Sequence, residues 1–197
     1  MIDKKAERRA QILACARNVF ARRGYHAAKI DEIVEAAGVA RGTFYLYFDD
    51  KRAIFAELVD RFLARLHLSI QRIDVEGDIE QQVKANARAV ISLFLQDRAM
   101  TKILLTDAPG LDAEFDRKLL AIYEEMIEYL VQSLEEGQSL GIVAQGDARI
   151  FAFLTVGALK ELLQQAVRRD FGEDRADWLA EQVYAFLSGG YLRIPAR

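Results

Sequence analysis

The chain has 197 residues and a net charge of −3; 52% of its residues are hydrophobic, 29% are charged and only two are prolines. This composition is typical of a soluble globular protein rich in helix, and the single cysteine, Cys15, excludes an intrachain disulfide framework. The opening residues are polar and no apolar run approaches the roughly 20 residues that span a membrane, so we expect no secretory signal, no membrane contact and a cytoplasmic protein.

The charge is distributed unevenly along the chain. Residues 1–55 carry eleven basic and seven acidic side chains, a balance of +4, whereas the remainder carries 16 basic and 23 acidic side chains, a balance of −7. A basic N-terminal segment favours contact with phosphates. The alternative is chance unevenness, so the charge supports a function in DNA binding without establishing it.

Apolar residues recur at helical spacing in four successive segments of the N-terminal third. The predicted helices cover about 4–23, 30–37, 40–46 and 50–66. Gly24 and Gly38 end the first and second helices, because glycine is the usual residue after a helix C-terminus. Asp49 or Asp50 caps the fourth. The sequence therefore predicts a compact head of three short helices, followed by a longer helix.

The remainder of the chain also reads as helix. Five further helices are predicted at about 78–96, 98–106, 112–137, 147–169 and 174–190. The clearest helix breaker is the run Asp107-Ala108-Pro109-Gly110, and Asp112 opens the helix after it. No alternating strand pattern and no convincing repeat is present. We therefore predict an all-α fold of about nine helices.

Residues 30–48 carry the pattern that points to a function. A predicted helix, a tight turn at Gly38 and a second short helix make the geometry of a helix-turn-helix. In the second helix Val39, Phe44 and Phe48 are spaced to face the core, which leaves the remaining positions facing outward. The candidate DNA contacts from this helix and the start of the next are Arg41, Gly42, Thr43, Tyr45, Tyr47 and Lys51.

Each of these residue types has chemistry that suits a DNA groove. Arg41 can donate two hydrogen bonds to a guanine edge or bind a phosphate, and Thr43 offers a hydroxyl and a methyl group. Gly42 lets the backbone approach DNA closely, and the tyrosine hydroxyls can donate to phosphates. Lys51 lies near the start of the fourth helix, where we expect it to hold another phosphate. The alternative, that the two tyrosines are ordinary surface residues, leaves their grouping with Arg41 unexplained.

A longer run of residues carries a resemblance to a known family. The matching residues, over about residues 8–58, are Gly24-Tyr25, Ile30-Asp31-Glu32-Ile33, Ala37-Gly38-Val39, Gly42-Thr43-Phe44-Tyr45, Tyr47-Phe48, Lys51 and Ile54-Phe55. In type and spacing they resemble the DNA-binding head of the TetR (tetracycline repressor) family. The resemblance implies a homodimer that represses a nearby operon until a small molecule binds its body. We accordingly predict a DNA-binding domain over 1–50 and a ligand-binding and dimerisation domain over 51–197.

Two alanines depart from the family's usual pattern. Ala28 stands where a threonine usually caps the second helix and touches phosphate, and Ala40 stands where a serine or threonine often opens the recognition helix. Each replacement removes a side-chain cap, at a cost of about 1 kcal/mol. We expect the charge of Lys29 to replace the phosphate contact that Ala28 lacks.

The last two predicted helices have too much apolar surface for one buried stripe. Helices that are apolar around most of their circumference must be covered from two sides. We predict that one side packs inside the body and the other meets a second copy in a four-helix bundle, where Gly157 and Ala158 permit a close crossing. Two recognition helices about 34–36 Å apart, or a multiple of it, then read a palindromic operator on double-stranded DNA.

A small-molecule effector is expected to bind inside the body, on helices that enclose its centre. The candidate lining residues are Phe94, Met100, Leu104, Phe115, Tyr123, Met126 and Phe151. Such a stripe is more often ordinary core, so the assignment is a hypothesis. A fatty acyl group or an aromatic compound are the effectors that these apolar side chains suit.

The sequence contains few residues in patterns typical of an enzyme active site. It has only two histidines, His26 and His67, and contains no nucleophile motif, glycine-rich phosphate loop or metal-spaced cluster, so we predict no catalytic residues, no cofactor and no metal. A helical adaptor that binds only protein is the other alternative, but it leaves the outward polar set of residues 41–47 unexplained. DNA binding that weakens steeply with added salt separates the two functions.

Overall fold

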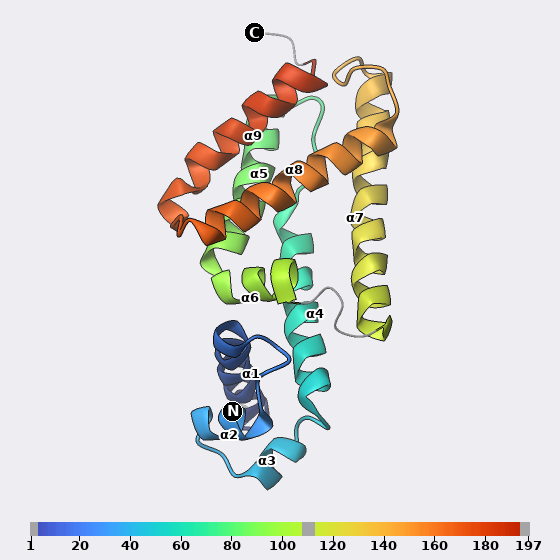
Figure 1. Cartoon of the computed structure of the whole chain (residues 1–197). Helices are drawn as coiled ribbons and strands as arrows, with labels where there is room; N and C mark the ends of the chain where they lie inside the picture. Colours follow the sequence, from blue (N-terminus) through green and yellow to red (C-terminus); the bar gives the residue numbers. More distant parts are fainter. Residues whose placement is uncertain (1–3, 108–112, 194–197) are drawn as a thin grey trace.

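The computed structural model describes residues 4–107 and 113–193, and within this part it consists of nine α-helices and short turns with no β-strand (Figure 1). The helices are α1 (Lys4–Arg23), α2 (Ile30–Ala36), α3 (Arg41–Tyr45), α4 (Lys51–Ser69), α5 (Ile79–Gln96), α6 (Arg98–Lys102), α7 (Ala113–Ser139), α8 (Ala148–Arg168) and α9 (Ala176–Gly190). The predicted all-α fold is confirmed. The predicted breaker at Pro109 and Gly110 and the helix-opening Asp112 lie outside the described residues.

The helix ends follow the local chemistry of the sequence. Gly24 and Gly38 have φ angles of 76° and 61°, a left-handed conformation that disfavours any residue with a Cβ. Asp50, rather than Asp49, caps α4, because its side chain accepts a hydrogen bond from the Ala53 N–H at 2.7 Å. These caps fix the turns on either side of α2 and α3.

Two predicted helices are divided in the structure. The helix expected over 98–106 is α6 followed by a π-helical turn, Ile103–Asp107. The helix expected over 174–190 begins as a short 3₁₀ turn, Glu173–Arg175, before α9. The spacing of apolar residues does not distinguish a π-helical or a 3₁₀ turn from a turn of α-helix.

The head is built around one apolar core. The predicted stripe of α1, which includes Ile12, Ala16 and Phe20, is fully buried. Phe44 and Phe48 lie under α3 and join it, as their spacing predicted. The apolar face of α4 continues this core from the head into the body, so α4 connects the two parts (Figure 1).

The body has two apolar clusters. The larger one continues from α4 into α5, α6 and the packed faces of α8 and α9. The smaller one joins α7 to the start of α8, and its buried residues are Ile127, Val131, Leu134, Val143, Ala148 and Ala152. Figure 1 shows α7 on one side of the body, with α8 crossing from it towards the other side.

In the described part of the chain, α8 is the helix that is long and apolar enough to cross a membrane by length and composition. The sequence, which has no long uninterrupted apolar run, predicted no such segment. The apolar side chains of α8 give it a high mean hydropathy even though polar residues interrupt them, with Lys160 and Glu161 near its middle.

Candidate nucleic-acid interface and effector region

The segment 30–48 folds as the predicted helix-turn-helix. α2 and α3 are joined through the turn at Gly38, where the Val39 N–H donates to the Val34 carbonyl at 3.0 Å. Phe44 is fully buried beneath α3 and orients the helix, which leaves Arg41 and Tyr45 on its outer surface. The short helix therefore presents polar side chains outward because one aromatic side chain anchors its inner face.

The predicted contacts differ in exposure. Arg41, Gly42 and Tyr45 are exposed, whereas Thr43 and Tyr47 are half-buried, and Tyr47 packs partly against the head core. The most exposed large apolar side chain beside them, Leu46, is 76% exposed. Nothing in the sequence marked Leu46 as a DNA contact, because an apolar side chain forms no hydrogen bond.

Arg41 is held in place on the surface of the head. Its guanidinium contacts Asp31 of α2 at 2.7 Å, and both side chains are more than half exposed. A hydrogen bond with Tyr45, together with the charge of Asp31, raises the pKa of Arg41. An exposed ion pair contributes little free energy, so Arg41 can exchange Asp31 for a base or phosphate at small cost.

Lys51 is half-buried, and its ammonium is directed towards the turn between α1 and α2. Its ammonium donates to the carbonyls of Tyr25, His26 and Ala28 at 2.7, 3.2 and 3.0 Å, and lies 4.4 Å from the centre of the Tyr25 ring. Burial lowers the pKa of Lys51. An ammonium has three N–H donors, so a phosphate contact would require Lys51 to give up a carbonyl of the α1–α2 turn.

Arg9 anchors the far end of α3, a role that the sequence did not reveal. Its guanidinium donates to the Tyr47 carbonyl at 2.6 Å, contacts both carboxylate oxygens of Glu57 on α4, and lies 4.3 Å from the centre of the Phe48 ring. Burial opposes the ionisation of Glu57, but hydrogen bonds from Arg9 and Arg61 outweigh it and lower the pKa. These partners lie 38 to 48 residues from Arg9, which no local pattern indicates.

The helix starts are capped differently from the expected family pattern. Lys29 is the residue before α2, and its N–H donates to the Glu32 carboxylate at 3.1 Å. Ala28 is buried, and Ala40 precedes α3 with no side-chain cap. The side chain of Lys29 is exposed, so its ammonium lies on the surface of the head.

A basic hollow adjoins the outer face of α3. It is lined by Lys4, Lys5 and Arg8 from the first turns of α1 and by Leu46 and Tyr47, which directly follow α3. The basic excess of residues 1–55 is therefore concentrated partly beside the candidate recognition helix. Positive charge at this position favours a polyanion on the same face.

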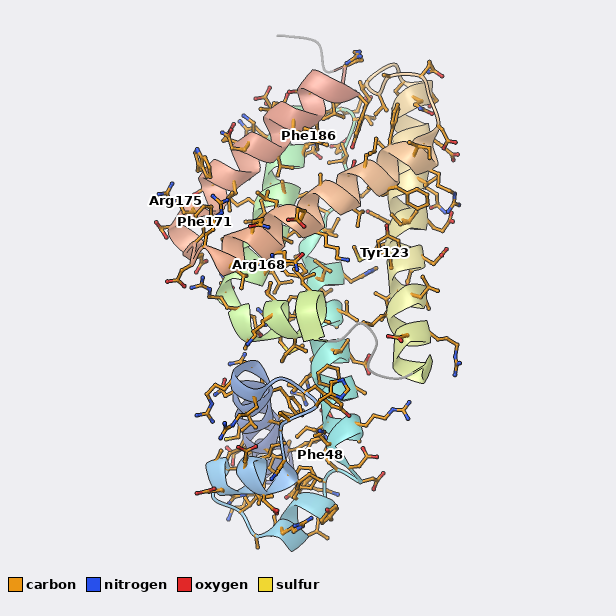
Figure 2. The ribbon with its side chains drawn as sticks, in the orientation of Figure 1. Phe48, Tyr123, Arg168, Phe171, Arg175 and Phe186 are labelled. Carbon is orange, nitrogen blue, oxygen red and sulfur yellow. The ribbon has the colours of Figure 1, made fainter. Side chains whose placement is uncertain are left out.

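The candidate effector residues do not all come together. Phe94 and Met100 are buried in the larger cluster, and Leu104 and Met126 pack partly against it. Phe151 belongs to the smaller cluster, where its ring stacks on Tyr191 with centres 4.9 Å apart. Tyr123 of α7 is partly exposed (Figure 2). The side chain of Phe115 lies outside the described residues.

Exposed apolar side chains gather on α8 and α9. Phe153 and Leu154 on α8 and Trp178 and Phe186 on α9 are each 41–60% exposed, and Phe186 is labelled in Figure 2. A Cβ placed at Gly157 of α8 would meet no atom of this chain within 4 Å. The apolar surface that the sequence assigned to a second contact is therefore uncovered in the single chain.

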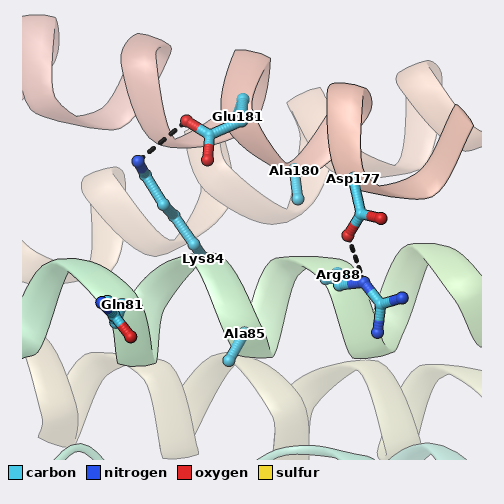
Figure 3. Close-up of a pocket in the computed structure, with 7 residues that line it drawn as sticks. All are labelled: Gln81, Lys84, Ala85, Arg88, Asp177, Ala180 and Glu181. Atoms are coloured by element: carbon cyan, nitrogen blue, oxygen red, sulfur yellow. Dashed lines mark hydrogen bonds and ion pairs between the residues drawn. The ribbon is translucent and has the colours of Figure 1, made fainter.

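A hollow between α5 and α9 holds charges that are already paired (Figure 3). Lys84 of α5 contacts Glu181 of α9 at 2.8 Å, and Arg88 contacts Asp177. Because each cation has an acidic partner, this hollow does not offer a free charge to a ligand. The ion pairs instead hold α9 against α5.

The two-helix turn, the outward polar face of α3 and the adjacent basic hollow define the class of helix-turn-helix DNA-binding proteins. The sequence pattern of bacterial regulatory proteins of the tetR family matches residues 12–58. An uncharacterized HTH-type transcriptional regulator of Bacillus subtilis, YdgC, is 32% identical over 96% of this chain and 95% of its own. The chain therefore belongs to the TetR family of transcriptional regulators, and this family is not one of enzymes.

Two further similarities concern fatty acid regulators. The fatty acid metabolism regulator protein of Bacillus subtilis is 28% identical over 86% of this chain and 88% of its own. The crystal structure of the regulator FadR from Bacillus subtilis in complex with stearoyl-CoA superposes with a TM-score of 0.75. It is 25% identical and covers 92% of this chain and 98% of that one.

Proposed function

We propose that this protein is a transcriptional repressor that binds a palindromic operator as a homodimer and is released from it by a fatty acyl-CoA. The observation that carries the DNA-binding half of this proposal is the outer face of α3, where Arg41 and Tyr45 project beside a basic hollow. Similarity to FadR-type regulators supports the acyl-CoA half.

In this function Arg41 reads a guanine edge or holds a phosphate, and Gly42 lets the backbone approach the groove. Tyr45 donates to a phosphate, and Thr43 contacts a base or the backbone from a half-buried position. Lys29 adds a phosphate contact by charge. Tyr47 and Lys51 contribute from half-buried positions, where Lys51 also holds the α1–α2 turn through its carbonyl contacts.

The homodimer is proposed to form through α8 and α9. Their uncovered faces carry large apolar side chains, and pairing them with a second copy makes a four-helix bundle. A lipid bilayer is a poorer partner for α8, because the exposed Lys160 and Glu161 near its middle would be costly in hydrocarbon. A close crossing at Gly157 fits another helix.

The acyl chain is proposed to lie against the larger cluster of the body. The apolar side chains of Phe94, Met100, Leu104 and Met126 come from α5, the α6 region and α7, and all belong to or pack on that cluster. Phe115 and Tyr123 belong to the same helix, α7, as Met126. Phe151 is proposed to act from the smaller cluster, by fixing the end of α8.

The test has three readouts on the full chain. Light scattering after size-exclusion chromatography should give a dimer at micromolar concentration, and a monomer would refute the symmetric model. Operator fragments selected from a random DNA pool should bind with an affinity that falls steeply with salt. Added stearoyl-CoA should release that DNA, whereas binding of protein partners alone, with no DNA selected, would favour an adaptor.

A further inference from the structure

A buried carboxylate lies where the head meets the body. Asp97, between α5 and α6, is 7% exposed, and its Oδ1 accepts a hydrogen bond from the Met100 N–H that caps α6. Its Oδ2 accepts a hydrogen bond from Arg17 of α1 at 3.0 Å and lies 3.6 Å from a guanidinium nitrogen of Arg65 on α4. One side chain thus joins the head helix, the connecting helix and a body helix.

A second contact fixes the other end of α6 to the head. The ammonium of Lys102 donates to the Ala21 carbonyl in the last turn of α1 at 3.0 Å. A cation at this position also interacts favourably with the C-terminal end of the helix dipole. α6 therefore contacts α1 through polar side chains at both of its ends.

One hydrogen-bond donor at this junction between head and body has no acceptor in the described part of the chain. The Nε of Arg17 is buried and has no hydrogen-bond partner among the described residues. A buried donor without an acceptor costs free energy, so a shift of α1 against α6 that gave this N–H a partner would recover part of that cost.

We propose that Asp97 is the positioning residue through which the body sets the orientation of the DNA-binding head. A buried carboxylate stripped of its cations is strongly unfavourable, so α1, α4 and α6 move together while both arginines remain bound. An effector that displaces α6 relative to α4 must either carry α1 with it or break the Arg17 contact. Carrying α1 along changes the orientation of α3, whereas breaking the contact uncouples the head from the body. The proposal deepens the proposed function and rests on it.

The variant Asp97→Asn separates this role from the capping role of the same residue. An asparagine oxygen still accepts from the Met100 N–H, because Asn and Asp are comparable helix N-caps, but the charge that holds the arginines is gone. Arg17→Gln removes the same contact from the head side. Asp177→Asn is the matched control, since it removes a carboxylate from the ion pair with Arg88 in the body.

The first readout is the head-to-body distance in the full chain without DNA or effector. Spin labels at Glu35→Cys on α2 and Gln81→Cys on α5, in a Cys15→Ser background diluted with unlabelled chain, report this distance. We expect Asp97→Asn and Arg17→Gln to broaden or shift the distance distribution, and Asp177→Asn to leave it unchanged. Distributions identical to that of the unsubstituted labelled chain in both variants would overturn the proposal.

The second readout is the ratio of operator Kd values with and without stearoyl-CoA. Coupling between two sites commonly changes affinity by about 5–150-fold, and we expect the ratio in Asp97→Asn to fall towards one. An undiminished ratio in both variants would also overturn the proposal. Failure of the unsubstituted protein to bind DNA or respond to stearoyl-CoA would refute the proposed function instead, while the distance measurement still decides the role of Asp97.

Discussion

The replacement Lys51→Met tests whether Lys51 stabilises the head or contacts DNA. Methionine keeps most of the apolar stem but removes the three hydrogen bonds to the α1–α2 turn. Each such bond contributes about 0.5–1.5 kcal/mol net, and the desolvation that lowers the pKa of Lys51 offsets part of the sum. We expect a loss of about 2 kcal/mol, which for a chain of this size lowers Tm by about 4–8 °C.

The assay is thermal unfolding followed by circular dichroism at pH 7 without DNA. Lys29→Met is the matched control, because the Lys29 side chain is exposed and the Lys29 contact that holds Glu32 comes from the backbone. The control should melt within about 1 °C of the unsubstituted protein, as surface changes of this kind usually do. It should nevertheless bind DNA more weakly, with a smaller salt dependence. A normal Tm for Lys51→Met together with weakened DNA binding would refute the structural role of Lys51.

Three further outcomes are expected. Arg41→Ala and Tyr45→Phe should weaken operator binding in gel-shift titrations, by about tenfold or more for Arg41, while the dimer stays intact; unchanged affinity would count against α3 as the recognition helix. Phe186→Glu should give a monomer by light scattering. The control Leu68→Glu, at an apolar residue of α4 that is even more exposed, should not. The ionised Glu57 carboxylate stabilises the folded protein above its unfolded pKa of about 4.3, and this stability is lost as pH falls through its lower folded pKa. Glu57→Gln should therefore weaken the dependence of stability on pH in the acid range. An unchanged dependence would contradict the pairing with Arg9.

Local sequence pattern was sufficient to locate the α-helices and the helix-turn-helix, although it missed the π-helical and 3₁₀ turns. Apolar spacing and two stop glycines are local signals, because an α-helix brings residues three and four apart onto one face. Phe44 and Phe48 were for this reason assigned correctly to the core. The excess apolar surface of α8 and α9 was also readable, since it is a property of each helix by itself.

Only the tertiary structure decided which polar groups meet. Arg9 reaches Glu57 and the Tyr47 carbonyl, and Asp97 reaches Arg17, across 38 to 80 residues of sequence. The Lys51 ammonium, which the sequence predicted to hold a phosphate, also donates to three carbonyls of the α1–α2 turn, and these converge only after folding. A long flexible side chain has many possible partners along the chain, and packing of the helices selects among them.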